Sequence, residues 1–145
     1  MRVLVALTYY RPHISGLTMY AQRLAEGLAD AGHRMTVLTS CYDQDLPVEE
    51  TRNGVRIVRV PVLSRIGKGV LMTGYRCQVR RLVAASDVVL INYPITPPES
   101  GALLDAARSR QWPVAVEART WGGTTTLSSG FQPARSSMAV LSNSR

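Results

Sequence analysis

Two short apolar runs, at residues 2–7 and 34–39, flank a segment whose apolar residues recur at helical spacing. Runs this short, bounded by polar residues, are typical of strands that are buried on both faces of a sheet. The intervening segment places its apolar side chains on one face of a helix: Leu17, Tyr20, Ala21, Leu24, Ala25 and Leu28. Strand, helix and strand in this order predict two parallel strands joined by a right-handed crossover.

The remaining segments continue the alternation of strands and helices. Strands are predicted at 55–60, 87–92 and 112–116, and helices at 73–85 and 99–110, with Asn53-Gly54 as a turn and 41–50 as irregular. In the strand at 55–60, Arg56 and Arg59 are expected on a more exposed face. This alternation predicts an α/β fold with a Rossmann-like, doubly wound parallel sheet.

The chain has 145 residues, which suits one domain. We expect the domain to span residues 1–117. Ten of the 26 residues from Thr120 onward are Ser or Thr, and only 138–141 suits a strand. Residues 118–145 are therefore expected to be a Ser/Thr/Gly-rich tail, either poorly ordered or a truncated continuation of the domain.

The formal net charge is +7, and residues 52–81 carry eight basic and no acidic side chains. An anionic partner is expected for such a surface. Apolar residues lie among Arg65, Lys68, Arg76 and Arg80, which suits an acidic membrane surface, although a merely solvated basic face is the alternative. Nucleic acid is not expected as a partner, because no nucleic-acid-binding motif accompanies the charge. Without a signal peptide or an apolar run of about 20 residues, we expect a cytoplasmic protein, peripheral to the inner face of the membrane.

In a parallel sheet, ligands bind beyond the carboxyl ends of the strands, which here means loops 8–17, 92–98 and 117–123. In the first loop, Ser15 and Gly16 enter a helix whose free amides suit a phosphate. The alternatives are that Gly16 serves only the turn and that Ser15 or Thr18 is an N-cap. His13 is a candidate functional imidazole in the same loop, against the alternative of an exposed side chain with no role.

Several function classes lack their signatures. The dinucleotide-binding pattern of three glycines and the phosphate-loop pattern ending in Gly-Lys are both absent. Two Cys and two His without metal-ligand spacing make a zinc site improbable. A phospho-receiver is disfavoured because no acidic cluster follows the first strand, which leaves a small-ligand sensor as the non-enzyme alternative.

The segments 10–16 and 31–39, the strand 53–61 and the strand 87–92 together resemble the N-terminal domain of family 4-like glycosyltransferases. The resemblance implies the N-terminal half of a GT-B fold, transfer with retention of configuration from a nucleotide-sugar, and neither a metal nor another cofactor. It implies that Gly16 and Ser15 contact the donor diphosphate. It places the acceptor, which can be lipid-linked, near His13, Thr18, Asn92, Pro94 and Arg119.

The chain departs from the family pattern at two positions. The loop has one glycine where the family often has two, and Glu117-Ala-Arg-Thr120 replaces a Thr-Tyr-His motif, so Arg119 falls near the place of the missing His. Nothing in the sequence corresponds to the donor-binding C-terminal domain. We therefore expect the chain to be inactive alone. It would need a donor-binding domain, either in the same polypeptide or as a separate chain. The alternative is a non-catalytic fragment of a split or truncated gene that binds a phosphorylated ligand only.

Overall fold

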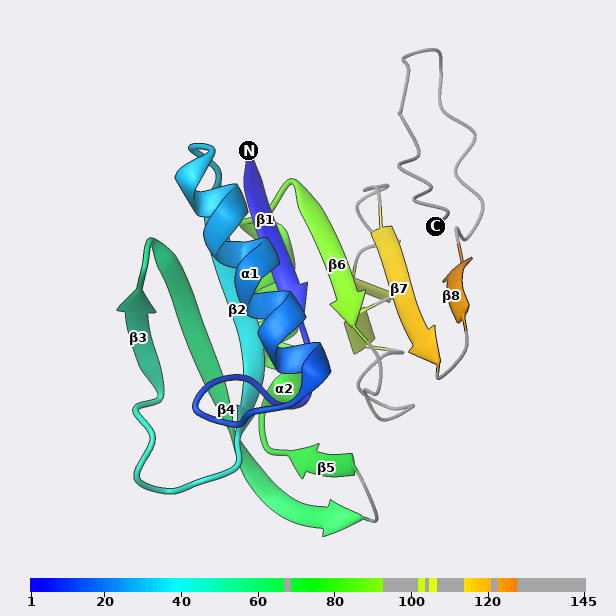
Figure 1. The fold of residues 1–145 in the computed structure, drawn as a ribbon. Helices are drawn as coiled ribbons and strands as arrows, with labels where there is room; N and C mark the ends of the chain where they lie inside the picture. The colour runs from blue at the N-terminus through cyan, green and yellow to red at the C-terminus, as the bar shows by residue number, and fades with distance from the viewer. Residues whose placement is uncertain (67–68, 93–101, 104, 107–113, 121–122, 128–145) are drawn as a thin grey trace.

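The computed structural model describes residues 1–66, 69–92, 102–103, 105–106, 114–120 and 123–127. The strands are β1 (Arg2–Ala6), β2 (Arg34–Cys41), β3 (Glu49–Arg52), β4 (Val55–Ile66), β5 (Gly69–Met72), β6 (Val88–Asn92), β7 (Val114–Thr120) and β8 (Gly123–Leu127). The helices are α1 (Gly16–Asp30) and α2 (Tyr75–Ala84). The described strands join in the order β3-β4-β2-β1-β6-β7-β8, and β5 pairs with β4 (Figure 1).

The five inner strands of this path are parallel. β1 pairs with β2 on one side and with β6 on the other, and the sheet continues to β4 and to β7. β3, β5 and β8 add antiparallel pairs at the margins. The chain moves outward from β1 to β4 and then returns to the other side of β1 as β6. This reversal is the topological switch point at which open α/β sheets form a ligand crevice, and it confirms the predicted fold class.

α1 covers one face of the sheet and α2 covers the other (Figure 1). α1 packs Ala21 and Ala25 against alternate residues of the strands, including Val5 and Val37. α2 packs on the opposite face, where its buried side chains meet Leu4 and Leu38. Those α2 side chains are Tyr75, Val79, Leu82 and Val83, the four predicted from helical spacing. Burial on both faces explains why the inner strands read as continuous apolar runs.

The ends of α1 follow from local sequence. Ser15 is the N-cap residue, and its side-chain oxygen accepts from the amide of Thr18. Gly32 has a φ of +87° just beyond the helix, and the amides of Gly32 and His33 donate to the carbonyls of Ala29 and Leu28. This left-handed termination favours glycine. The most buried residues of the helix, Thr18, Ala21 and Ala25, are small, so α1 lies close to the sheet.

The structure differs from the sequence prediction at the β3–β4 margin. Residues 41–50 were predicted to be irregular, but Glu49 and Glu50 begin β3, whose polar side chains give no alternating apolar pattern. The Asn53-Gly54 turn is confirmed, with φ values of 49° and 75°. β4 extends to Ile66, six residues beyond the predicted end.

The described residues cover only part of the chain beyond residue 98, for which a helix at 99–110 and strands at 112–116 and 138–141 were predicted. Residues 102, 103, 105 and 106 are helical, as predicted for 99–110, and Leu103 is buried in the core. β7 runs on to Thr120 and is followed by β8, which the sequence did not predict. The predicted strand at 138–141 lies outside the described residues, and the domain boundary at 117/118 stays a prediction.

Candidate functional site at the β1–α1 loop

Hydrogen bonds from the end of β2 fix the loop that follows β1. The carbonyl oxygen of Thr8 accepts from the amide of Ser40 at 3.1 Å and from the hydroxyls of Thr39 at 3.1 Å and Ser40 at 2.5 Å. The Tyr10 side chain is buried in the α1-side core, and this burial raises its pKa to about 12. The start of the loop is therefore fixed on the sheet edge at which β1 and β2 end.

A buried arginine on β4 fixes the middle of the loop. The Arg59 side chain is 1% exposed, and its Nη2 donates to the carbonyl oxygen of Arg11 at 3.0 Å. The same guanidinium donates to the carbonyl of Pro47 at 3.0 Å and pairs with the Glu50 carboxylate at 2.5 Å. The prediction that Arg59 lies on an exposed face is wrong, because β3 brings Glu50 beside it and supplies the charge partner that burial requires.

Three side chains form a connected group at the end of the loop. The hydroxyls of Ser15 and Thr18 lie 2.5 Å apart, and Thr18 Oγ1 lies 3.5 Å from His13 Nδ1. Thr18 is buried, whereas His13 and Ser15 are half-buried. The alternative that Ser15 or Thr18 is an N-cap is thus observed for Ser15, and the Thr18 hydroxyl lies between Ser15 and the imidazole of His13.

Aromatic rings surround that imidazole. The ring of Tyr9 stacks on His13 with centroids 4.9 Å apart, and Tyr42 meets both rings edge-on at 5.7 and 5.9 Å. Burial raises the pKa of Tyr42, and its backbone hydrogen bond with His13 opposes that rise. Tyr9 and Tyr42 each follow the end of an inner strand, so a sequence search of the strand ends could have found both.

Gly16 begins α1 beside this group. A Cβ added at Gly16 would meet no atom within 4 Å among the described parts of the chain, and its φ is not in the left-handed region. The first helical hydrogen bond runs from the Met19 amide to the Ser15 carbonyl, so the helix itself offers no acceptor to the amides of Gly16 and Leu17. Among the described residues, neither packing nor backbone conformation requires glycine at position 16.

For the other two predicted ligand loops, 92–98 and 117–123, the structure describes only the backbone positions of the candidate residues. Asn92 is the last residue of β6, one position beyond the pair formed by Ala6 and Ile91. Arg119 lies on β7, two residues beyond Glu117, which pairs with Asn92. Parallel register therefore places Asn92 and Arg119 toward the edge that carries the β1–α1 loop. Pro94 lies outside the described residues.

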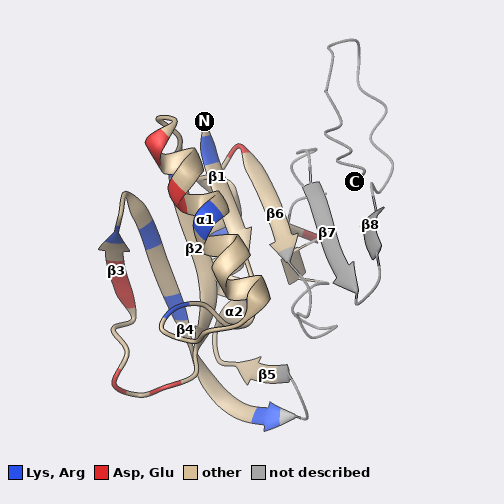
Figure 2. Ribbon diagram, viewed as in Figure 1, with Lys and Arg blue, Asp and Glu red and all other residues tan. Residues whose placement is uncertain are grey.

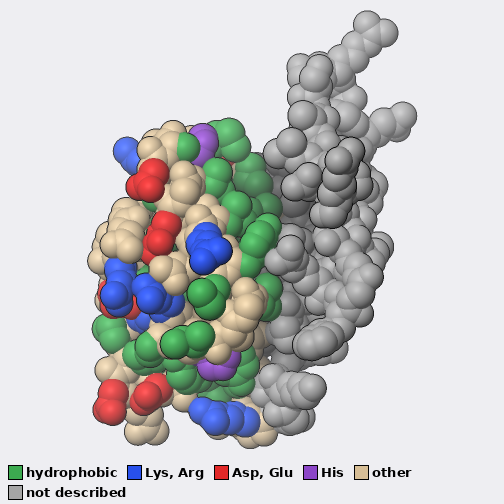
Figure 3. Space-filling view, viewed as in Figure 1, with side chains coloured by type: hydrophobic (Ala, Val, Ile, Leu, Met, Phe, Trp, Pro, Cys, Tyr) green, Lys and Arg blue, Asp and Glu red, His purple; other side chains and the backbone are tan. Residues whose placement is uncertain are grey.

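The predicted basic patch is spread over separate elements. Arg65 is exposed on β4 and donates to the carbonyl of Tyr42 at 2.9 Å, whereas Arg76 and Arg80 are exposed on α2. Lys68 lies outside the described residues. β3 brings acidic residues alongside the basic residues of β4 (Figure 2), and both signs of charge are interspersed on the face that carries α1 (Figure 3). Two of the eight basic side chains of residues 52–81, Arg56 and Arg59, pair with Glu49 and Glu50.

Within the described part of the chain, no three His, Cys, Asp or Glu side chains come close enough to hold a metal ion. None of the helices described there is long and apolar enough to cross a membrane.

Comparison with known proteins agrees with the fold. Residues 15–144 match the model of the glycosyl transferase 4-like domain. A 65-residue stretch is 40% identical to an uncharacterized glycosyltransferase of Methanocaldococcus jannaschii, covering 44% of this chain and 16% of that protein. The sucrose-phosphate synthase structure from Thermosynechococcus elongatus superposes with a TM-score of 0.52 at 18% identity, over 78% of this chain and 32% of that one.

The chain belongs to the glycosyl transferase 4-like family, because the family model matches far more than half of it. Its mostly parallel sheet matches the Rossmann-like fold of GT-B glycosyltransferases. The family assignment predicted from the sequence is thereby confirmed. The chain spans about a sixth of the curated relative and about a third of the structural neighbour.

Proposed function

We propose that this chain forms the acceptor-side domain of a retaining glycosyltransferase, which moves a sugar from a nucleotide-sugar to an acceptor above the β1–α1 loop. The observation that carries the proposal is the open space over Gly16 at the start of α1. That space lies at the switch point between β1 and β6, where a parallel sheet offers a ligand crevice. Membership of the glycosyl transferase 4-like family supports the same reaction class.

The amides of Gly16 and Leu17 are suited to the diphosphate of the donor. Negative charge develops on the leaving diphosphate, and fixed N–H dipoles at a helix N-terminus stabilise such charge. A side chain at position 16 would occupy the space through which a phosphate oxygen approaches these amides. The proposed reaction uses the nucleotide-sugar as co-substrate and no metal, so a chelator should leave donor binding unchanged.

The acceptor-side role falls to His13 and its aromatic neighbours. Thr18 Oγ1 lies 3.5 Å from the Nδ1 atom of this imidazole, and the Tyr9 ring stacks on it. Asn92 and Arg119 approach the same edge from β6 and β7 by register. A donor-binding second domain, in the same polypeptide or in a separate chain, would have to close over this edge for transfer to occur.

A lipid-linked acceptor on an acidic membrane surface is part of the proposal, with the protein peripheral to the inner face of the membrane. Leu63 on β4 is 69% exposed and Leu71 on β5 is 37% exposed, on the antiparallel pair that carries Arg65. α2 adds the exposed Arg76 and Arg80. Exposed leucines beside cations suit insertion at the interface of an anionic bilayer.

The proposal is tested by titrating the 145-residue chain with nucleotide-sugars, with and without a chelator, and following backbone amide chemical shifts. We expect saturable shifts at Gly16 and Leu17, and we expect Gly16→Val to abolish them while the fold is retained, because the added side chain meets open space. Gly27→Val is the matched control, since Gly27 lies on the same helix and a Cβ there also meets nothing within 4 Å of the described residues.

Two results would contradict the proposal. One is the absence of binding by any nucleotide-sugar to the folded chain, with lipid-linked sugar acceptors tested in parallel. The other is unchanged binding in Gly16→Val, which would remove Gly16 from the site. Donor binding that never leads to transfer when a donor-binding domain is supplied would instead favour a non-catalytic phosphate-binding fragment.

A further inference from the structure

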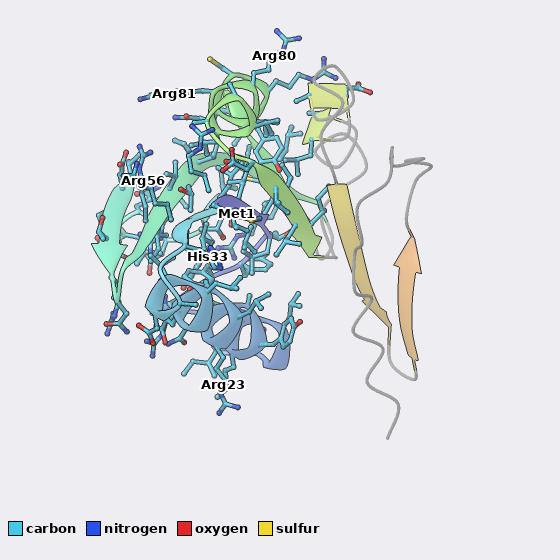
Figure 4. The ribbon with its side chains drawn as sticks, turned by 90° about the horizontal axis from the view of Figure 1, so that it is seen from above. Met1, Arg23, His33, Arg56, Arg80 and Arg81 are labelled. Atoms are coloured by element: carbon cyan, nitrogen blue, oxygen red, sulfur yellow. The ribbon has the colours of Figure 1, made fainter. Side chains whose placement is uncertain are left out.

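A hollow lies at the amino-terminal edge of the sheet, opposite to the β1–α1 loop. Its volume is about 370 Å³, within the range of small-ligand pockets. Its walls come from the starts of β1 and β2, from the β3–β4 hairpin and from the end of α2. Figure 4 shows the molecule from this edge. Met1, His33 and Arg56 lie next to the strands, and Arg80 and Arg81 project from α2.

Strand register gathers three arginines in this hollow. Arg2 of β1 pairs with Arg34 of β2, and Thr36 of β2 pairs with Arg56 of β4. The residues next to these arginines in the strands, Val3, Met35 and Val55, pack into the α1-side core. Because side chains alternate along a strand, Arg2, Arg34 and Arg56 all point to the α2 face. All three line the hollow.

The carboxylates near the hollow do not balance this charge. Asp87 pairs with Arg2 at 2.8 Å and Glu49 pairs with Arg56 at 2.6 Å. The Arg2 guanidinium holds the pKa of Asp87 at about 2, so this pair is fully charged at neutral pH. Arg34 has no carboxylate within ion-pair distance in the described parts of the chain. Directly opposed like charges on neighbouring strands are unfavourable, so an excess of positive charge is left beside Arg2.

The end of α2 does not supply the missing negative charge. The carbonyl of Leu82 already accepts from the Ala85 amide at 3.1 Å and from the Ser86 hydroxyl at 2.7 Å. The carbonyl of Val83 accepts from the Ser86 amide at 3.1 Å. These hydrogen bonds use the carbonyls of Leu82 and Val83, and a helix C-terminus carries only about half of an elementary charge. The full positive charge of Arg34 therefore has no carboxylate partner among the described residues, and it favours an anion.

We infer that this hollow binds the phosphate group of a phosphorylated compound, with Arg34 as the principal ligand and Arg2 and Arg56 beside it. The planar forks of guanidinium groups match phosphate oxygens and give strong, charge-assisted hydrogen bonds. The inference does not rest on the proposed glycosyl transfer, because the hollow lies at the opposite edge of the sheet from Gly16.

The test is a titration of the 145-residue chain with inorganic pyrophosphate, monitored by calorimetry and by backbone amide shifts. We expect saturable binding with shifts at Thr36, Thr51 and Ser86, which line the hollow. Arg34→Gln should weaken binding about tenfold, because it removes a charge-assisted contact. Arg23→Gln is the matched control: it removes the same charge from an exposed site on α1, on the far side of the molecule (Figure 4).

Further variants test whether pyrophosphate binding depends on the charge of the hollow and where on the chain it occurs. Asp87→Asn should tighten pyrophosphate binding, because it frees Arg2 from its carboxylate. Gly27→Val, on α1 and outside both proposed sites, should leave the shifts at Thr36, Thr51 and Ser86 unchanged. Vesicles of phosphatidylglycerol, compared with neutral phosphatidylcholine, identify the source of the phosphate: a loss of vesicle binding in Arg34→Gln indicates a lipid headgroup, and retained vesicle binding indicates a soluble compound. Either result supports a phosphate site.

Three results would overturn the inference. The first is no saturable binding by the folded chain. The second is equal weakening by Arg34→Gln and Arg23→Gln, which would show a response to net charge only. The third is binding that Gly16→Val abolishes and Arg34→Gln leaves intact, which would place pyrophosphate at the start of α1 and so favour the proposed donor site instead.

Discussion

The guanidinium of Arg59 donates a 3.0 Å hydrogen bond to the carbonyl oxygen of Arg11, which lies 48 positions earlier in the chain. A residue on β4 therefore fixes the loop that leads into α1. The same guanidinium holds Pro47 and Glu50, so the β2–β3 connection and the β1–α1 loop share one buried anchor. The Nε atom of Arg59 is buried without a hydrogen-bond partner in the described structure, so this anchor leaves one donor unsatisfied.

Replacing this anchor with Met should destabilise the protein and loosen the candidate site. Arg59→Met leaves the Glu50 carboxylate and two carbonyl oxygens without their donor. Losing one member of a buried ion pair costs about 3–5 kcal/mol, and we expect about 2–3 kcal/mol here because the Glu50 side chain is 32% exposed. Urea unfolding measures the change in the free energy of unfolding, and amide shifts at residues 11–16 report on the loop.

A matched control lies on the same strand. Arg56 pairs with Glu49 at 2.6 Å, but both side chains are well exposed at 41% and 52%. Arg56→Met should therefore cost much less than Arg59→Met, because exposed ion pairs contribute little. Equal losses for the two variants would mean that Arg59 does not act as a buried anchor.

Sequence patterns predicted the parts of the fold that depend on local chemistry. The stripe on α2 from Tyr75 to Val83 was found because its four apolar residues recur at helical spacing. Gly32 and the Asn53-Gly54 turn were found because left-handed backbone favours these residues. The first strands were found because buried parallel strands are continuously apolar.

The missed features depend on contacts between distant segments. β3 carries Glu-Glu-Thr-Arg, which has no apolar side chain to mark a strand, and it forms because β4 offers an edge. Arg59 is buried only because that edge strand brings Glu50 beside it. The grouping of Tyr9, His13 and Tyr42 likewise requires that β1 and β2 end side by side. Ser15 and His13 were predicted as residues of the ligand loop. Their contacts with Thr18 were not predicted, because these contacts depend on the residue at which α1 begins.

The N-cap at Ser15 should contribute measurably to stability. Ser15→Ala removes the oxygen that accepts from the Thr18 amide at 3.2 Å. Loss of such a cap typically costs about 1 kcal/mol, and urea unfolding should show a loss of this size. Ser15→Asn, which retains a capping oxygen, should restore most of the stability. Equal losses in the two variants would argue against capping as the role of this side chain.

The exposed arginines of α2 should contribute to binding of anionic vesicles. Each basic side chain near an anionic surface contributes about 1 kcal/mol, so Arg80→Gln should weaken vesicle binding about fivefold. Sedimentation with phosphatidylglycerol vesicles measures this change, and added salt should reduce it. Arg23→Gln carries the same charge change on the α1 side and should have little effect. Equal effects of the two variants would remove α2 from the membrane-facing surface.

The pair formed by Asp87 and Arg2 should make stability depend on pH in the acidic range. Asp87 accepts from the Arg2 amide at 2.7 Å and from the Arg2 guanidinium at 2.8 Å, and these bonds lower its pKa to about 2. Since the carboxylate of an unfolded chain has a pKa near about 4, the folded state gains stability from this group above about pH 4. That gain is lost as the pH falls toward 2.

Asp87→Asn isolates this contribution. The variant should melt below the wild-type temperature at neutral pH, and the difference between the two should shrink between about pH 4 and pH 2, because the wild-type carboxylate becomes neutral there as well. Asp45→Asn, in the exposed loop before β3, is the control and should follow the wild-type curve. A difference in melting temperature that persists unchanged below pH 2 would show that Asp87 stabilises the fold through its shape and hydrogen bonds and not through its charge.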